Sequence, residues 1–294
     1  MALVLVVGST GKLGRAIVRR LRADGVLVRA LVRPTSDVTV LRDSGAELVV
    51  GDLRNAESLR KACKGCGAVV TTASSLHTST GFDAKWTDRN GNLNLIEAAK
   101  WESVGHFVFT STIGADASDA PRVFGNKRFV EERLAASGLR HTIMRPAGFM
   151  ENLIPLIRWA RRTGIAVVPR PGTVQTSYIA IRDIAEIARL VLASTSARDS
   201  TIEFGGPEDL SMLDCMMLLE GVLGRRLRVV RVPLAPLRWI GRMVRPFNQT
   251  LDAVLEIVEF VERKGLRADR SFLSEYPVTL TPFNSFLREQ LGQG

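Results

Sequence analysis

The sequence is poor in cysteine, histidine and tyrosine. Its 294 residues include three cysteines, three histidines and two tyrosines. Cys63 and Cys66 form a single CxxC pair without a second pair, so the four ligands of a structural zinc site are lacking and we expect no metal centre. The pair is typical of a helix-end loop with small side chains, and a redox dithiol is the alternative. Three thiols without a disulfide framework fit a reducing compartment.

Long hydrophobic runs are also absent. Apolar runs such as Ala2–Val7 are far shorter than the roughly 20 residues of a membrane-spanning helix. No basic residue precedes that first run, and a glycine turn follows it in place of a cleavage site. The sequence therefore predicts neither a membrane span nor a signal peptide, and we expect a cytoplasmic protein.

Positive charge exceeds negative charge along the whole chain. The formal net charge is +10, and arginine supplies 33 of the 40 basic residues. The excess is +7 in residues 1–150 and +3 in residues 151–294, so it is spread over both halves. A nucleic-acid-binding domain gathers its charge in one patch and carries a recognition motif. We therefore expect no nucleic-acid partner.

Strand-length apolar runs alternate with helical patterns in the first half. We expect strands at Leu3–Val7, Val26–Val32, Ala46–Val50, Ala68–Thr72, His106–Thr110 and His141–Met144. The intervening helices are expected at Lys12–Ala23, through Leu59 and Ala62, at roughly Lys85–Lys100 and at Gly125–Ala136. Because the strand runs do not alternate with polar residues, both faces of the sheet should be buried. This pattern predicts an α/β fold, a Rossmann doubly wound parallel sheet.

The rhythm changes after Pro146. Helices are expected at Ile184–Ala193, with Asp183 as the N-cap, and at Ser211–Leu223 and Leu251–Val261. We expect residues 1–150 to form an NAD(P)-binding Rossmann domain. Residues 151–294 would then form a smaller C-terminal α/β substrate lobe, some of whose segments return to the sheet.

A glycine-rich turn follows the first strand and opens the first helix. It reads Gly8-Ser9-Thr10-Gly11-Lys12-Leu13-Gly14, a GxxGxxG pattern. Gly8 permits the tight turn, Gly11 lets the backbone approach a pyrophosphate, and Gly14 allows close packing of helix on strand. Backbone N–H groups at the helix N-terminus then meet the phosphates, whose charge the helix dipole favours. The sequence predicts dinucleotide binding at this turn.

The end of the second strand predicts which dinucleotide binds. An acidic residue here would hold the ribose 2′-hydroxyl of NAD, whereas Arg33 favours the 2′-phosphate of NADP. The hydroxyls of Thr35 and Ser36 complete an anion pocket, and Lys12 adds charge from the turn. We expect a preference for NADP(H), with NAD(H) as the alternative.

With these motifs the chain resembles the NmrA-like atypical short-chain dehydrogenase/reductase family. The resemblance rests on Val6–Gly11, Leu31–Arg33, Gly51–Leu53, Asn94–Ala99, Phe107–Ser111, Ser137–Leu139, Arg145–Pro146 and Phe149–Asn152. It is good to about residue 195 and looser beyond, where the chain is similar to members that act in photosystem assembly. The family implies a Rossmann fold, NADP(H) and a small substrate lobe. Its members include quinone and carbonyl reductases and also catalytically silent regulators or assembly factors.

The resemblance assigns roles to residues after each strand. It implies that Asp52 and Leu53 touch the adenine, that Ser111 and Thr112 lie near the nicotinamide, and that Lys127 holds the nicotinamide ribose. Further contacts are implied for the ribose-side residues Thr72, Ala73 and Ser74 and for the nicotinamide-flanking residues Pro146, Ala147, Gly148 and Phe149.

The sequence departs from this pattern at the catalytic tyrosine. The superfamily's YxxxK pair places a phenol four residues before the lysine, but here Val123 occupies that position and cannot donate a proton. Candidate substitutes are His77, whose ordinary pKa lies near neutrality, and Tyr178, with Lys127 and Ser111 as the other polar groups.

We expect an NADPH-dependent reductase of a quinone or small carbonyl compound. The alternative is a silent NADP(H)-binding regulator or assembly factor that binds a protein partner, and the chain is expected to be a monomer or homodimer.

Residues 225–245 contain seven arginines, and no acidic residue lies between Glu220 and Asp252. The pattern predicts a helix with Leu237, Ile240, Met243 and Val244 on one face and Arg238, Arg242 and Arg245 on another. Such a segment either covers the substrate lobe as a surface helix or makes a peripheral contact with an anionic membrane or a protein partner.

Overall fold

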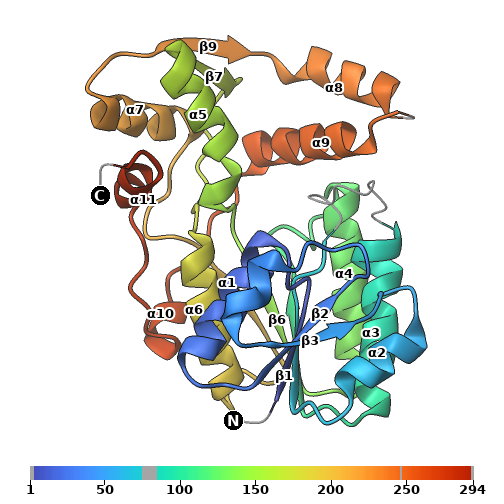
Figure 1. Cartoon of the computed structure of the whole chain (residues 1–294). Coiled ribbons are helices and arrows are strands. Elements are labelled where there is room, and N and C mark those ends of the chain that lie inside the picture. Colours follow the sequence, from blue (N-terminus) through green and yellow to red (C-terminus); the bar gives the residue numbers. More distant parts are fainter. Residues whose placement is uncertain (1–2, 75–84, 246, 293–294) are drawn as a thin grey trace.

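The computed structural model describes residues 3–74, 85–245 and 247–292. Its central feature is a seven-stranded sheet with the order β3-β2-β1-β4-β5-β6-β8, in which every neighbouring pair is parallel (Figure 1). The strands are β1 (Val4–Val7), β2 (Val28–Val32), β3 (Glu47–Val50), β4 (Ala68–Thr71), β5 (His106–Thr110), β6 (His141–Pro146) and β8 (Ser200–Phe204). The predicted Rossmann fold is confirmed. Its strand order reverses between β1 and β4, where such sheets bind their ligands.

Helices cover both faces of this sheet (Figure 1). One face carries α1 (Lys12–Ala23) and α6 (Ile181–Ala193), and the other carries α2 (Ala56–Cys63), α3 (Asn92–Trp101) and α4 (Arg122–Ala135). Val4 and Val6 of β1 pack in the first layer, whereas Leu5 and Val7 pack in the second. Successive strand residues point to opposite faces, so the unbroken apolar runs have buried positions on both sides.

The remaining elements form the C-terminal lobe beside the carboxyl edge of the sheet. They include a two-stranded parallel sheet of β7 (Ile165–Pro169) and β9 (Arg228–Val232). The helices are α5 (Ile154–Thr163), α7 (Met212–Leu223), α8 (Leu234–Val244), α9 (Gln249–Lys264) and α11 (Phe283–Gln290). Shorter helical segments are η1 (Thr39–Ser44) and η2 (Lys85–Gly91) in the Rossmann half and η3 (Met150–Asn152) before α5. Among the helices described, none is long and apolar enough to cross a membrane.

Segments after residue 150 return to the main sheet. β8 pairs with β6, α6 packs on α1, and α10 (Phe272–Glu275) places the ring of Phe272 5.8 Å from that of Phe204. The expected return of C-terminal segments is therefore visible, and the predicted boundary at residue 150 stays a prediction.

The expected N-cap at Asp183 was wrong. Helix α6 begins at Ile181 after Ala180, and Glu151 accepts the Ile181 N–H at 3.0 and 3.1 Å. Asp183 lies in the first turn and accepts hydrogen bonds from the N–H (2.7 Å) and hydroxyl (2.8 Å) of Thr281. A cap supplied from 30 residues away leaves no local signal. By contrast, Ser211 caps α7 through a capping box with Asp214, as its residue type predicts.

The CxxC pair lies in a helix-end loop after α2. Cys63 and Cys66 are both buried, and burial raises the pKa of the Cys63 thiol to about 12. A redox-active thiol needs a lowered pKa and access to solvent. The geometry thus favours the structural interpretation over the redox dithiol.

Candidate functional site

The glycine turn has the close contacts that its spacing predicts. Gly8 has φ +78°, and a Cβ there would lie 2.7 Å from Thr72 Oγ1. A Cβ on Gly14 would lie 2.1 Å from the Gly8 carbonyl oxygen, so only glycine fits. Gly11 is exposed, and a Cβ there would lie 3.2 Å from the Gly8 oxygen. Gly8 and Gly14 are therefore needed by the fold itself, whereas the position of Gly11 faces outward, toward the place expected for a pyrophosphate.

Helix α1 presents an open N-terminus at this turn. Gly11 is its N-cap, no side chain in the described part of the chain caps it, and its first turn holds no acidic residue. Lys12 is exposed beside it. Uncapped N–H groups and a nearby cation attract an anion. The hydroxyl of Ser9 donates to the Leu31 carbonyl at 2.7 Å, which ties the turn to the end of β2.

The end of β2 forms a polar turn. The N–H of Ser36 donates to the Arg33 carbonyl at 3.0 Å, which turns the chain back around Thr35. Arg33 is half-buried and Thr35 is exposed. The adjacent strand β1 carries the glycine turn, so Arg33 and the backbone of that turn lie at the same edge of the sheet.

The residues expected near the adenine and ribose follow β3 and β4. Asp52 accepts the Arg54 N–H at 2.8 Å, and the carbonyl of Leu53 accepts the Asn94 side-chain amide at 2.9 Å. Thr72 directs its hydroxyl to the carbonyl of Val7 at 3.2 Å, which joins β4 to the start of the glycine turn. Ala73 is buried, and Ser74 is the last residue described in this segment. Strand order thus brings these residues to one edge with the glycine turn.

The end of β5 holds two buried hydroxyl groups. Thr110 and Ser111 are 6% and 3% exposed, and within the described residues neither hydroxyl oxygen has a hydrogen-bond partner. Buried polar groups are nearly always satisfied, so this pair without partners is an unusual feature of the end of β5. Thr112 is less buried and follows directly.

Lys127 lies beneath this strand end. It is buried on α4, its Nζ donates to the carbonyl of Thr110 at 2.8 Å, and it lies 5.4 Å from the centre of the Phe109 ring. Burial lowers the pKa of the Lys127 ammonium, while the charges of Asp88 and Glu131 oppose that shift. Lys127 is therefore held at the end of β5 by its contacts, next to the two hydroxyls.

The missing tyrosine leaves no gap. Val123 is 1% exposed and packs in an apolar cluster with Phe124, Ala147 and Phe260, among others. The rings of Phe124 and Phe260 meet edge to face at 5.7 Å. Phe260 comes from α9, so the C-terminal lobe covers the position that a catalytic phenol would occupy. No local pattern indicated that α9 packs here, because the contact joins segments more than 130 residues apart.

The candidate proton donors are not gathered at one point. Tyr178 is 8% exposed and its ring lies behind Gly148, where an added Cβ would be 3.1 Å from two ring carbons. Burial raises the pKa of the Tyr178 phenol far above its usual value, which makes it a poor acid. His77 lies outside the described residues. His106 and His141 begin β5 and β6, at the opposite edge of the sheet from the glycine turn.

An ion-pair cluster supports the strand ends from below, and sequence reasoning missed it. Arg145 of β6 is buried and forms a two-pronged contact with buried Glu131 of α4 at 3.0 and 2.7 Å. It also reaches Asp116 and Glu203, each at 2.8 Å. The cluster joins β6, α4, β8 and the loop after β5, so it fixes the framework around Ser111 and Lys127. The motif Arg145-Pro146 was visible, but its partners were not.

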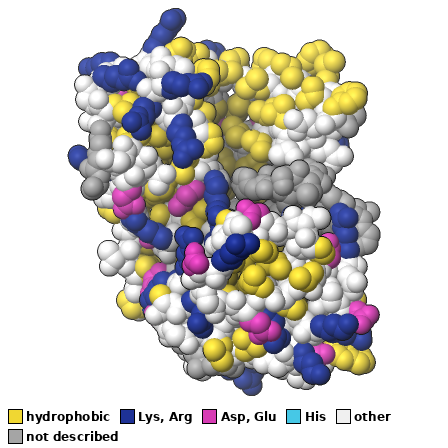
Figure 2. Space-filling model, viewed as in Figure 1, with side chains coloured by type: hydrophobic (Ala, Val, Ile, Leu, Met, Phe, Trp, Pro, Cys, Tyr) yellow, Lys and Arg dark blue, Asp and Glu magenta, His cyan; other side chains and the backbone are white. Residues whose placement is uncertain are grey.

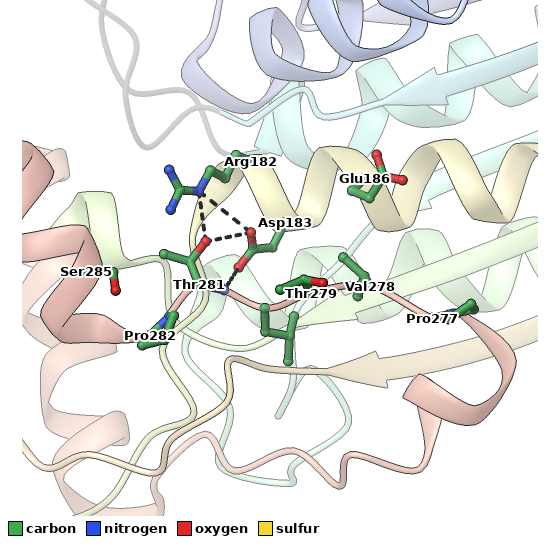
Figure 3. A pocket seen from close by; sticks show the side chains of 10 residues that line it. Arg182, Asp183, Glu186, Pro277, Val278, Thr279, Thr281, Pro282 and Ser285 are labelled. Atoms are coloured by element: carbon green, nitrogen blue, oxygen red, sulfur yellow. Dashed lines mark hydrogen bonds and ion pairs between the residues drawn. The ribbon is translucent and has the colours of Figure 1, made fainter. Parts of the chain in front are cut away.

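The surface depression in Figure 3 lies apart from these residues, between α6 and the segment before α11. Its polar groups already contact one another: Arg182 Nε donates to the Thr281 hydroxyl at 2.8 Å, and Thr281 is held by Asp183 (Figure 3). We interpret it as the seam where the C-terminal segment docks on α6. The edge formed by the ends of β1, β2, β4 and β5 remains the candidate site.

A family model described as NAD(P)H-binding matches residues 8–195, more than half of the chain. The chain belongs to this NAD(P)H-binding family. The match begins at the first glycine of the turn and ends just after α6, so it includes the glycine turn and strands β2 to β6 of the main sheet. The family predicted from the motifs is confirmed at this level, and the chain is an NAD(P)H-binding protein.

The relatives of this chain have names that describe different functions. A photosystem II assembly factor, Ycf39 of Synechocystis sp., is 29% identical over 99% of this chain and 91% of the relative. An NAD(P)H azoreductase of Xenophilus azovorans is 31% identical over 79% of this chain and 78% of the relative. The solved Escherichia coli NADPH-dependent quinone oxidoreductase in complex with NADPH shares 20% identity and a TM-score of 0.84, covering 98% of this chain and 99% of that one. The structural similarity to the last of these proteins covers both lobes of the chain.

Proposed function

We propose that this protein is an NADPH-dependent reductase whose preferred acceptors are quinones or similar flat, conjugated molecules. The observation that carries the proposal is the composition of the β5 edge. Buried hydroxyls and a buried lysine lie beside an apolar wall that contains Val123 and Phe124. The polar groups would orient the nicotinamide end of a cofactor, and the apolar wall beside them offers no proton to an acceptor.

The assigned roles follow from where each group lies. The turn at Gly8–Gly14 would hold the pyrophosphate, and Arg33 with Thr35 and Ser36 would hold a 2′-phosphate. NADPH, when bound, supplies a hydride. Lys127, Ser111 and Thr110 would orient the nicotinamide end, while Val123 and Phe124 keep water from one side of it. Hydride transfer to a quinone yields a hydroquinone anion that solvent can protonate, so the chain needs no acid of its own.

A second candidate is a silent NADP(H)-binding assembly factor. It is favoured by the way Phe260 closes the apolar cluster around Val123, since a site that has lost its acid and is covered by α9 need not turn over. The assembly-factor relative that matches 99% of this chain supports the same candidate.

NADPH oxidation separates the two candidates. Purified protein is mixed with NADPH and a panel of benzoquinones, naphthoquinones, azo dyes and simple ketones, and absorbance at the NADPH band is followed. Turnover with a quinone supports the reductase. Tight NADPH binding in a calorimeter without turnover on any acceptor supports the assembly factor.

Cofactor preference is a separate prediction. We expect NADP(H) to bind about tenfold more tightly than NAD(H), because one charge-assisted contact from Arg33 to a 2′-phosphate contributes about 1.4 kcal/mol or more. Arg33→Ala should remove this difference and leave NAD(H) affinity unchanged. Arg19→Ala, which removes an exposed arginine from the far part of α1, is the matched control and should alter neither affinity. Equal calorimetric affinities of the native protein for the two dinucleotides would contradict the assignment.

A further inference from the structure

The α8–α9 hairpin carries an apolar surface that no described part of the chain covers. Trp239 is 65% exposed, Met243 59% and Phe247 93%. Together with Ile240, Leu251 and Val254 they form what we call the hairpin patch. Figure 2 shows hydrophobic side chains gathered at the upper right, over the place where Figure 1 draws α8 and α9. Monomeric proteins rarely expose several large apolar side chains side by side without a binding role.

The arginines of this region are divided between the interior and the surface. Contrary to the sequence prediction, Arg238 does not belong to an outer basic face. It is 7% exposed and donates to Asp252 at 3.0 Å and Glu259 at 2.9 Å. Arg228 and Arg231 lie on strand β9. Arg242 and Arg245 remain exposed beside the patch, and the guanidinium of Arg245 lies 3.7 Å from the Asp252 carboxylate.

Three acidic side chains of α9, those of Asp252, Glu256 and Glu259, form ion pairs with arginines. Asp252 is 1% exposed and is held by Arg238 and by Arg122 of α4. Glu256 pairs with Arg122 at 3.1 Å. Since no acidic residue lies between Glu220 and Asp252, the charge on the α8 side of the hairpin patch is positive. Arg225, Arg226, Arg228 and Arg231 extend this exposed positive charge along β9 and the turn before it.

We propose that the hairpin patch is a peripheral binding site for an anionic lipid bilayer. Tryptophan, phenylalanine and methionine side chains can enter the headgroup region, while the flanking guanidinium groups pair with lipid phosphates. Basic residues close to an anionic membrane surface strengthen its binding. The segment from Arg225 to Arg245 holds no acidic residue, so its exposed arginines match a negatively charged surface. The proposal does not depend on which acceptor the protein reduces.

Vesicle flotation tests the proposal with the full chain. Purified protein is mixed with vesicles of phosphatidylcholine alone, or of phosphatidylcholine with phosphatidylglycerol, at low and high salt. We expect binding to the vesicles that contain phosphatidylglycerol, weakened by salt, and little binding to neutral vesicles. Failure to bind phosphatidylglycerol vesicles, or equal binding to both kinds, overturns the proposal.

Variants locate the binding surface. Trp239→Ser with Phe247→Ser should lower the vesicle partition coefficient about tenfold, because two large apolar side chains no longer enter the bilayer. Phe247→Ser alone, at a side chain that is almost wholly exposed, should lower it about threefold. Trp101→Ser is the matched control, since Trp101 is 68% exposed on α3 and lies outside the patch. An NADPH affinity equal to that of the native protein would show that each variant is folded.

Two results would assign the surface differently. If the control variant lowers binding as much as the patch variants, the hairpin is not the site and the proposal fails. If light scattering shows a dimer that Trp239→Ser with Phe247→Ser dissociates, while no vesicle binding is found, the patch belongs to a second copy of the chain and the lipid proposal is overturned.

Discussion

Replacing Gly11 with valine should weaken NADPH binding about 100-fold, equivalent to about 2.7 kcal/mol, and leave the fold intact. Gly11 has φ −72° and ψ 164°, an extended conformation that valine readily adopts. Its position is exposed, and an added Cβ meets only the Gly8 oxygen at 3.2 Å, a contact that a small shift of the turn relieves. The branched side chain would therefore occupy the space expected for the pyrophosphate and would disturb little else.

Two other glycines make this prediction specific. Gly221→Val is the matched control, because an added Cβ at this exposed position of α7 meets nothing within 4 Å, and NADPH affinity should stay unchanged. Gly14→Ala should instead lower the melting temperature, since its Cβ would lie 2.1 Å from the Gly8 oxygen and force β1 and α1 apart. Nucleotide affinity is measured by quenching of intrinsic fluorescence and stability by thermal unfolding. A Gly11→Val protein that binds NADPH like the native chain would show that the turn is not the phosphate site.

The parts of this molecule that the sequence predicts well are those whose causes are local. The glycine turn, helix α1 and the strand ends are set by residues that are neighbours in the chain. Helix Lys12–Ala23 has the predicted bounds because its apolar spacing and its glycine start lie in one segment. The same holds for Ser211, whose capping partner Asp214 is three residues away.

The parts that could not be predicted depend on distant partners. Asp183 has the residue type of an N-cap, but Thr281 takes its carboxylate and Glu151 caps the helix in its place. Arg238 has the spacing of a surface residue, yet Asp252 and Glu259 draw it inside. Val123 showed that a phenol was missing, and only the packing of Phe260 showed that an apolar wall had replaced it. In each case an attraction across the fold outweighed a local preference.

The composition of that wall leads to the prediction with the largest expected effect. We expect the native protein to reduce a simple ketone or aldehyde with a kcat/KM about 100-fold to 10,000-fold below that for a quinone. This range is the usual contribution of a positioned general acid, which a ketone requires and a quinone does not. Val123 and Phe124 have no proton to donate, and burial keeps the Tyr178 phenol a weak acid. Steady-state kinetics with a paired quinone and ketone measure the ratio, and rapid turnover of the ketone would contradict the expectation.

Restoring the phenol tests the reason for this ratio. Val123→Tyr alone should overpack the cluster and cost about 1–3 kcal/mol of stability, because Val123 is 1% exposed and Phe260 already fills the adjoining space. Phe260→Ala makes room, so the double variant should hold a tyrosine four residues before Lys127, whose ammonium would lower the pKa of the new phenol. Ketone reduction should then exceed that of Phe260→Ala alone, which is the control for the opened space, while quinone reduction changes less. If both acceptors gain equally, access past α9 and not the missing acid limits the reaction.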